Sequence, residues 1–191
     1  MGREFELKYA ADGETLAQIE REYAPFRQIR METAYYDDGE KNISRLRWTL
    51  RRRLENGVSI CTVKTTLPDG SRGEWETEAA DVEAALPVLI AMGAPEELAA
   101  FARNGLVRTC GARFTRKAAL LPAGAGQVEL ALDRGVLLGG GRELPFCEVE
   151  VEQKQGTDEE TRCFAANLAQ RFALLPQPGS KLKRAMELGN L

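Results

Sequence analysis

Charged and apolar side chains alternate in short segments of this sequence, a spacing that could assemble an ionic site. In REFELKY, residues 3–9, Glu4, Glu6 and Lys8 are separated by single apolar residues. Successive side chains of a β-strand point to opposite faces, so these three charges would share one face. CEVEVE, residues 147–152, repeats the pattern with glutamates, whose like charges repel unless cations lie between them. Both segments predict strands whose charged face lines a site.

The same alternation recurs in four more segments. The charged faces would carry Arg47, Thr49, Arg51 and Arg53; Arg72, Glu74, Glu76 and Glu78; Arg113, Thr115 and Lys117; Glu129 and Asp133; and, in the segment noted above, Glu148, Glu150 and Glu152. A closed barrel with an ionic interior would satisfy all of these strands at once, because helices could cover its apolar outer face.

An interior with acidic and basic sectors suits a particular class of ligand. Arginine and lysine bind phosphate oxygens with charge-assisted hydrogen bonds, and carboxylates hold Mg²⁺ that bridges to the same oxygens. The sequence contains no histidine, which excludes His-based catalysis and nitrogen ligands for a metal. Any metal should therefore be a hard cation such as Mg²⁺ or Mn²⁺. A long, highly charged polyphosphate with its metal ions would complement such an interior.

Composition sets the class of protein. The chain has 191 residues, 43% of them hydrophobic, and a formal net charge of −3, so neither nucleic acid nor a membrane surface is an expected partner. It shows no apolar run of membrane-spanning length and no signal-peptide pattern, which favours a cytoplasmic location. The 4 cysteines form no CxxC pair and are expected to be free thiols.

The remaining elements follow from periodicity and turn residues. Helices are expected at 12–24, 81–105 (two short ones), 157–174 and near the C-terminus, and strands at 26–38, 44–67, 69–79, 106–121, 126–138 and 142–155. Asn56-Gly57 predicts a hairpin, and Thr157 with Glu160 predicts a capping box. With no long linker or internal repeat, residues 1–191 are expected to form one domain.

Several of these motifs together resemble the CYTH family, the triphosphate tunnel metalloenzymes. EFELK resembles the family's ExExK opening, LRRR (50–53) its LRxR, and SKLKRA (180–185) its terminal SKxxR segment. Further matches are YYDD, TVK, RGEWE, VELALDRG and CEVEVE, with Arg113 and Arg116 in the late basic strand. Arg52 departs from the family's apolar residue within LRxR, and we expect it on the outer face.

The resemblance implies an α+β fold, an eight-stranded antiparallel closed barrel forming a tunnel with helices packed outside. It implies metal binding by Glu4, Glu6, Glu148 and Glu150, with Asp133 and Glu152 as further candidates. Triphosphate would be bound by Lys8, Arg51, Arg53, Lys64, Arg72, Arg113, Arg116, Lys181 and Arg184. The expected catalytic set is Lys8, Arg51, Arg53, Glu74 and Glu76, with Glu74 or Glu76 near a second metal ion.

The expected activity is Mg²⁺- or Mn²⁺-dependent hydrolysis of a triphosphate, with inorganic tripolyphosphate favoured because no segment suggests a nucleobase pocket. The alternatives are a class IV-type adenylate cyclase, a thiamine triphosphatase, and a protein that binds polyphosphate or nucleotides without turnover. The expected partner is a small-molecule triphosphate, and a homodimer is compatible with this interpretation.

Overall fold

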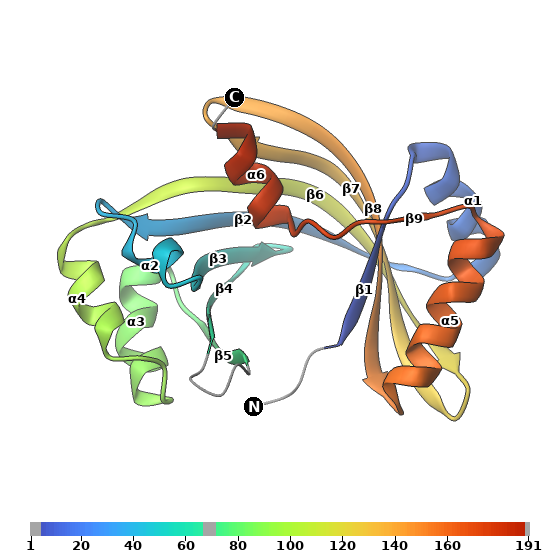
Figure 1. The fold of residues 1–191 in the computed structure, drawn as a ribbon, viewed down its shortest axis with the longest axis horizontal. Coiled ribbons are helices and arrows are strands. Elements are labelled where there is room, and N and C mark those ends of the chain that lie inside the picture. Colours follow the sequence, from blue (N-terminus) through green and yellow to red (C-terminus); the bar gives the residue numbers. More distant parts are fainter. Residues whose placement is uncertain (1–4, 67–71, 190–191) are drawn as a thin grey trace.

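A strongly curved antiparallel sheet of nine strands forms the framework of the protein (Figure 1). The computed structural model describes residues 5–66 and 72–189. The strands are β1 (Glu6–Ala10), β2 (Arg27–Asp38), β3 (Thr49–Glu55), β4 (Val58–Thr66), β5 (Arg72–Glu78), β6 (Leu106–Ala123), β7 (Gly126–Gly139), β8 (Arg142–Gln155) and β9 (Leu175–Pro176). Their order is β5-β4-β3-β2-β6-β7-β8-β1-β9.

The sheet is open, so the predicted closed barrel of eight strands is wrong. Strands β5 and β9 are its two edges, and within the described ranges no backbone pairing joins β5 to β1 or β9. The prediction failed because alternation determines which side chains share a face, and an open curved sheet shows the same alternation as a closed one. Whether two edges meet depends on the length and curvature of the strands.

Local turn chemistry explains much of the strand pairing. The hairpin predicted at Asn56-Gly57 is confirmed: these residues connect β3 to β4 with φ of 51° and 94°, and Glu55 pairs with Val58. Positive φ at both central residues gives a twist that suits antiparallel strands. The longer strands β6, β7 and β8 form a second antiparallel set of neighbours.

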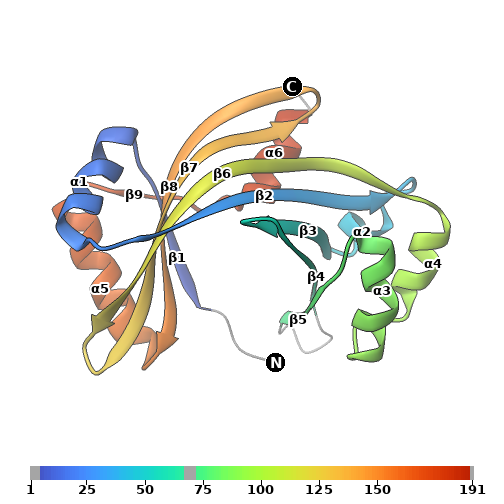
Figure 2. The same cartoon turned by 180° about the vertical axis from the view of Figure 1, so that it is seen from behind.

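Two apolar cores lie on the outer face of the sheet. The helices that cover them gather at the two ends of the sheet (Figure 2). Helices α1 (Gly13–Tyr23) and α5 (Asp158–Arg171) cover β7 and β8. Helices α2 (Asn42–Arg45), α3 (Val82–Ala91) and α4 (Glu97–Arg103) pack around β2–β5. The capping box predicted for α5 is confirmed. None of the helices within residues 5–66 and 72–189 has the length and apolarity needed to span a membrane.

Helix α6 (Lys181–Gly189) lies on the opposite, inner face, so the expectation that all helices pack outside is also wrong. It contacts β6, β7 and β8, and buries Ala185 against a core that contains Phe114 and Phe146. A Cβ at Gly139 of β7 would lie 2.0 Å from the Ala185 carbonyl oxygen, so this close approach requires glycine. Helix α6 thereby brings its first residues to the charged face of the sheet.

Candidate functional site

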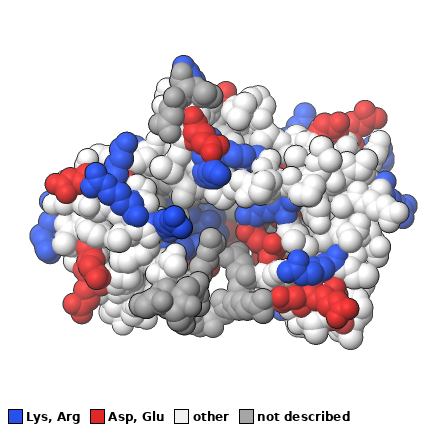
Figure 3. Space-filling view, in the orientation of Figure 1, with Lys and Arg blue, Asp and Glu red and all other residues white. Residues whose placement is uncertain are grey.

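A charged cavity of about 290 Å³ occupies the inner face of the sheet. Among the described residues, seven cations line it, Lys8, Arg47, Arg51, Arg53, Lys64, Arg116 and Lys181, against three carboxylates, Glu6, Glu150 and Glu152. Figure 3 shows Lys and Arg side chains gathered around the hollow at the centre of this face. The excess of positive charge makes the cavity a site for an anion.

The arginines of β3 and the lysine of β4 form a basic wall of this cavity. Period-2 alternation turns Arg51 and Arg53 inward, as the sequence predicted, and confirms Arg52 on the outer face, where its Nε donates to Ser59 Oγ at 2.8 Å. The Nε of Arg51 is buried and has no hydrogen-bond partner among the described residues. An anion that enters the cavity could satisfy such a donor, which is costly to leave unpaired.

Strand β5 supplies the acidic partners of the basic wall. Lys64 Nζ lies 3.1 Å from Glu74 Oε2, and Arg51 Nη2 lies 4.0 Å from Glu74 Oε1. Arg53 Nη2 lies 3.4 Å from Glu76 Oε2. Glu74 and Glu76, predicted as catalytic, are therefore salt-bridge partners of the cations in this state. The side chain of Arg72, at the start of β5, lies outside the described part of the chain.

Strand β1 contributes the charged pair that the opening motif predicted. Lys8 Nζ lies 2.7 Å from Glu6 Oε1, and both side chains line the cavity. Glu6 is directly opposite Glu152 of β8, and Lys8 is opposite Glu150. The charged faces of β1 and β8 therefore meet as expected, whereas Glu4 lies outside the described residues.

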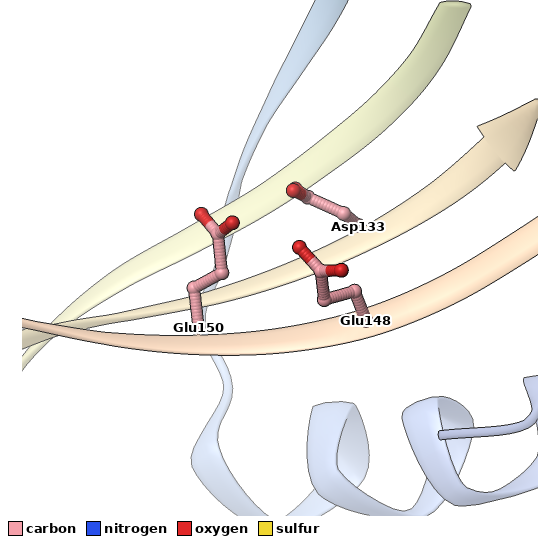
Figure 4. Close-up of side chains that lie close together, drawn as sticks. All are labelled: Asp133, Glu148 and Glu150. Carbon is pink, nitrogen blue, oxygen red and sulfur yellow. The ribbon is translucent and has the colours of Figure 1, made fainter. Parts of the chain in front are cut away.

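Three buried carboxylates from β7 and β8 converge beside the cavity (Figure 4). Asp133, Glu148 and Glu150, which we call the acidic trio, each place one carboxylate oxygen within 4.8 Å of the others. Asp133 and Glu148 are 0% exposed and Glu150 is 7% exposed. Asp133 is directly opposite Glu148 in the β7–β8 pairing, which explains how two strands bring these acids together.

Three cations neutralise the acidic trio. Lys181 Nζ contacts all three carboxylates, at 2.8 Å from Asp133, 2.5 Å from Glu148 and 2.7 Å from Glu150. Arg116 donates two hydrogen bonds of 2.8 Å to the carboxylate on β7 and a further one to Glu150 Oε2. The Arg184 guanidinium pairs with Glu148. Lys181 and Arg184, from the terminal SKxxR segment, thus reach the predicted carboxylates.

The burial of this cluster shifts the pKa values of its members. Burial raises the pKa of the Glu148 carboxyl. Burial also opposes ionisation of Glu150, but Lys181 and Arg116 outweigh it and hold the pKa of that carboxyl well below its usual range. Burial disfavours the Lys181 ammonium, yet the acidic trio outweighs this and raises the lysine's pKa. The cluster is therefore a network of mutually dependent charges.

Arg113, expected to bind substrate, lies elsewhere. It is on the outer face of β6, half-exposed, and forms a salt bridge with Glu143. Because Arg113 and Arg116 are three residues apart in one strand, they point to opposite faces, and only Arg116 points inward. The sequence interpretation had placed Arg113, Thr115 and Lys117 on the inner face of β6, which is wrong.

Arg47 lines the cavity although it was not selected as a site residue. It follows α2 with a left-handed backbone, φ 57°. Asp37 accepts hydrogen bonds from Ile43 N and Ser44 N, and Asp38 accepts one from Asn42 N at 2.7 Å, so the YYDD segment anchors α2. The alternation in the sequence had already placed Arg47 on the charged face with Arg51, although the family motif did not include it among the substrate-binding residues.

Comparison with known proteins places the chain. The CYTH domain matches residues 2–186, whereas no curated protein matches. Among solved structures, the PH1819 protein from Pyrococcus horikoshii is 22% identical, with TM-score 0.66, covering 97% of this chain and 99% of its own. HpAC1 from Hippeastrum is described as a proposed adenylyl cyclase with a dominant triphosphatase activity. It is 16% identical, with TM-score 0.70, and the match covers 99% of this chain and 97% of HpAC1. Both similarities support the fold, and the domain match shows that this chain belongs to the CYTH family.

Proposed function

We propose that the protein hydrolyses a triphosphate with a bound divalent cation, and that inorganic tripolyphosphate is its substrate. The observation that carries this proposal is the lining of the cavity, in which seven cations face three carboxylates among the described residues. A compact polyanion complements this charge, because each phosphate oxygen can accept charge-assisted hydrogen bonds from several sides. The triphosphatase activity ascribed to HpAC1 agrees with this substrate class.

In this proposal the residues that bind phosphate are those whose cations line the cavity. They are Lys8 on β1, Arg47, Arg51 and Arg53 on or before β3, Lys64 on β4, Arg116 on β6 and Lys181 on α6. The Nε of Arg51 offers a donor that has no partner among the residues that the structure describes. Arg113 is left out of this set because it pairs with Glu143 on the outer face, and Arg184 is left out because its guanidinium forms an ion pair with Glu148.

The carboxylates suit a hard divalent cation such as Mg²⁺ or Mn²⁺. The acidic trio supplies only oxygen donors, and these converge closely enough to share an ion. Glu6 and Glu152 extend the set into the cavity. A bound divalent ion would neutralise charge that develops on the phosphate oxygens during cleavage. The chain's own cations then orient the phosphate groups, and two of them, Lys181 and Arg116, already contact the trio.

The polar lining of the cavity and the small volume of the recess beside it favour an inorganic substrate over a nucleotide. Fifteen of its nineteen lining residues are polar or charged. An adjoining aromatic recess, bordered by Tyr35, Tyr36 and Trp48, measures only about 20 Å³. That volume has room for about one water molecule and none for a base. The proposal therefore places tripolyphosphate ahead of ATP and thiamine triphosphate.

The test is release of phosphate and pyrophosphate from tripolyphosphate, ATP and thiamine triphosphate, each with Mg²⁺ or Mn²⁺. We expect tripolyphosphate to be cleaved fastest and Glu6→Gln to abolish cleavage, because Glu6 lines the cavity and pairs with Lys8. Glu159→Gln, at an exposed position of α5, is the matched control and should retain full activity. Cyclic AMP with pyrophosphate from ATP would instead identify a cyclase, and metal-dependent binding without turnover would identify a binding protein.

A further inference from the structure

The Lys181 ammonium occupies the point at which the acidic trio converges. Its Nζ lies within 2.8 Å of one oxygen from each of Asp133, Glu148 and Glu150. Within residues 5–66 and 72–189, those are the carboxylates that lie close enough to share a single ion. A cation bound by all three would therefore have to take the place that this ammonium fills.

The charges of the cluster make simultaneous occupancy unfavourable. The trio carries three formal negative charges, which Arg116, Arg184 and Lys181 already balance. A divalent ion added beside the ammonium would bring like charges within a few ångströms of each other in a buried, weakly screened environment. Replacing the ammonium with the divalent ion avoids this repulsion and leaves the carboxylates bound by a cation.

Lys181 is better placed than Arg116 to leave the trio for the cavity. Arg116 belongs to the middle of β6 and binds Asp133 through two parallel hydrogen bonds, so the sheet holds it. Lys181 is the first residue of α6, and its side chain already lines the cavity. Leu182 is only partly buried, and the buried apolar anchors of the helix, Ala185 and Leu188, lie at least one turn further on. The ammonium can thus leave the trio while the rest of α6 stays packed.

We propose that Lys181 is an exchangeable counter-cation: it holds the acidic trio in the free protein and must move into the cavity when a divalent ion binds there. This inference rests on the metal site of the proposed function, and it adds that Lys181 sets the affinity of that site. On release, the ammonium enters the cavity where phosphate would bind. Lys181 is in this sense a positioning residue that couples metal binding to substrate binding.

The first test measures Mn²⁺ affinity by electron paramagnetic resonance, without substrate, in the wild type and in Lys181→Gln. Removal of the competing ammonium should tighten Mn²⁺ binding at least tenfold, and adding Asp133→Asn to this variant should remove the gain. Lys183→Gln is the matched control, because Lys183 lies on the same helix and is 70% exposed. Unchanged or weaker Mn²⁺ binding in Lys181→Gln would overturn the proposal, because an ammonium that competes with the ion for the trio must weaken its binding.

A second measurement needs no variant and covers the case in which Lys181→Gln does not fold. Hydrogen exchange of the wild type should show that Mn²⁺ speeds exchange in the first turn of α6 and leaves the amides around Ala185 protected. An unchanged first turn at saturating Mn²⁺ would contradict the exchange of cations. The hydrolysis assay is separate: a protein that cleaves no triphosphate but passes both metal tests would refute the proposed function alone.

Discussion

The two sides of the cavity use the same residue types in different ways. On the basic wall, the arginines and lysine of β3 and β4 meet the carboxylates of β5 at 3.1 to 4.0 Å, and Glu76 is 42% exposed. On the opposite side, the acidic trio and its three cations form a buried cluster with contacts of 2.8 Å or less. The first set has longer ion pairs with partly exposed carboxylates, and the second has shorter ion pairs with buried carboxylates.

This difference indicates which cations a ligand can bind at little cost in broken ion pairs. A partly exposed ion pair contributes about 1 kcal/mol or less, so a phosphate can replace the carboxylates of β5 at little cost. A buried cluster has already lost its hydration, so removing one partner leaves an uncompensated charge. We therefore infer that the basic wall is available to phosphate in the free protein. The buried cluster stabilises the sheet, and its Lys181 becomes available to phosphate only when another cation replaces it.

The largest expected effect comes from breaking the buried cluster. Arg116→Met should reduce the free energy of unfolding by about 3 kcal/mol, because two buried carboxylates lose a partner. Arg113→Met, on the outer face of the same strand, should cost less than about 1 kcal/mol. Urea unfolding monitored by circular dichroism measures both. Equal losses in the two variants would show that the buried cluster has no special role in stability.

The basic wall should show the reverse behaviour. Arg51→Ala should lower kcat/KM for tripolyphosphate about a hundredfold, or about 2.7 kcal/mol, because charge-assisted hydrogen bonds to phosphate are lost. Its free energy of unfolding should change by less than about 1 kcal/mol, since the Glu74 contact is 4.0 Å long. Arg52→Ala is the matched control on the outer face and should keep its activity. A large loss of stability without loss of activity would reverse the assignment of the two sides.

A smaller effect is expected at the end of the basic wall. Arg47→Ala should raise KM for tripolyphosphate about fivefold, because Arg47 lines the cavity at an exposed position and contributes one phosphate contact. Arg45→Ala, an exposed neighbour in α2, should leave KM unchanged. Steady-state kinetics at saturating Mg²⁺ distinguishes the two variants. An equal rise in both would indicate a general electrostatic effect of this region.

The sequence was sufficient to predict which side chains face the cavity where this depends only on the alternation within one strand. Alternation alone turns Glu6 and Lys8, and also Arg51 and Arg53, toward the cavity. It failed on β6, because Arg113 and Arg116 have opposite parity and the sequence offers no marker of which face is inward. The apolar face of that strand is also partly inner, since Phe114 packs beneath α6. Because α6 packs on the charged side of the sheet, an apolar side chain of a strand does not always point to the outer face.

The contact between Lys181 and the acidic trio could not be predicted from sequence patterns, because it joins segments that are far apart in the chain. Lys181 follows Glu148 by 33 residues, and the intervening segment includes α5 and β9. Its position depends on how closely α6 approaches β7, which requires the absence of a side chain at Gly139. The family motif identified Lys181 as a residue expected to bind triphosphate, but only the packing of α6 shows that it contacts carboxylates in the free protein.

Ionic strength offers the mildest way to separate the two sides. Raising NaCl from about 0.1 M to about 1 M shortens the Debye length from about 10 Å to about 3 Å, which screens the exposed basic wall but hardly the buried cluster. KM for tripolyphosphate should rise about threefold, because screening weakens long-range attraction into the positive cavity. The free energy of unfolding in urea should change by less than about 0.5 kcal/mol, because buried pairs are poorly screened. Potassium sulfate at equal ionic strength should give the same KM if screening is the cause; a larger rise with sulfate would show that the anion itself competes for the phosphate-binding cations.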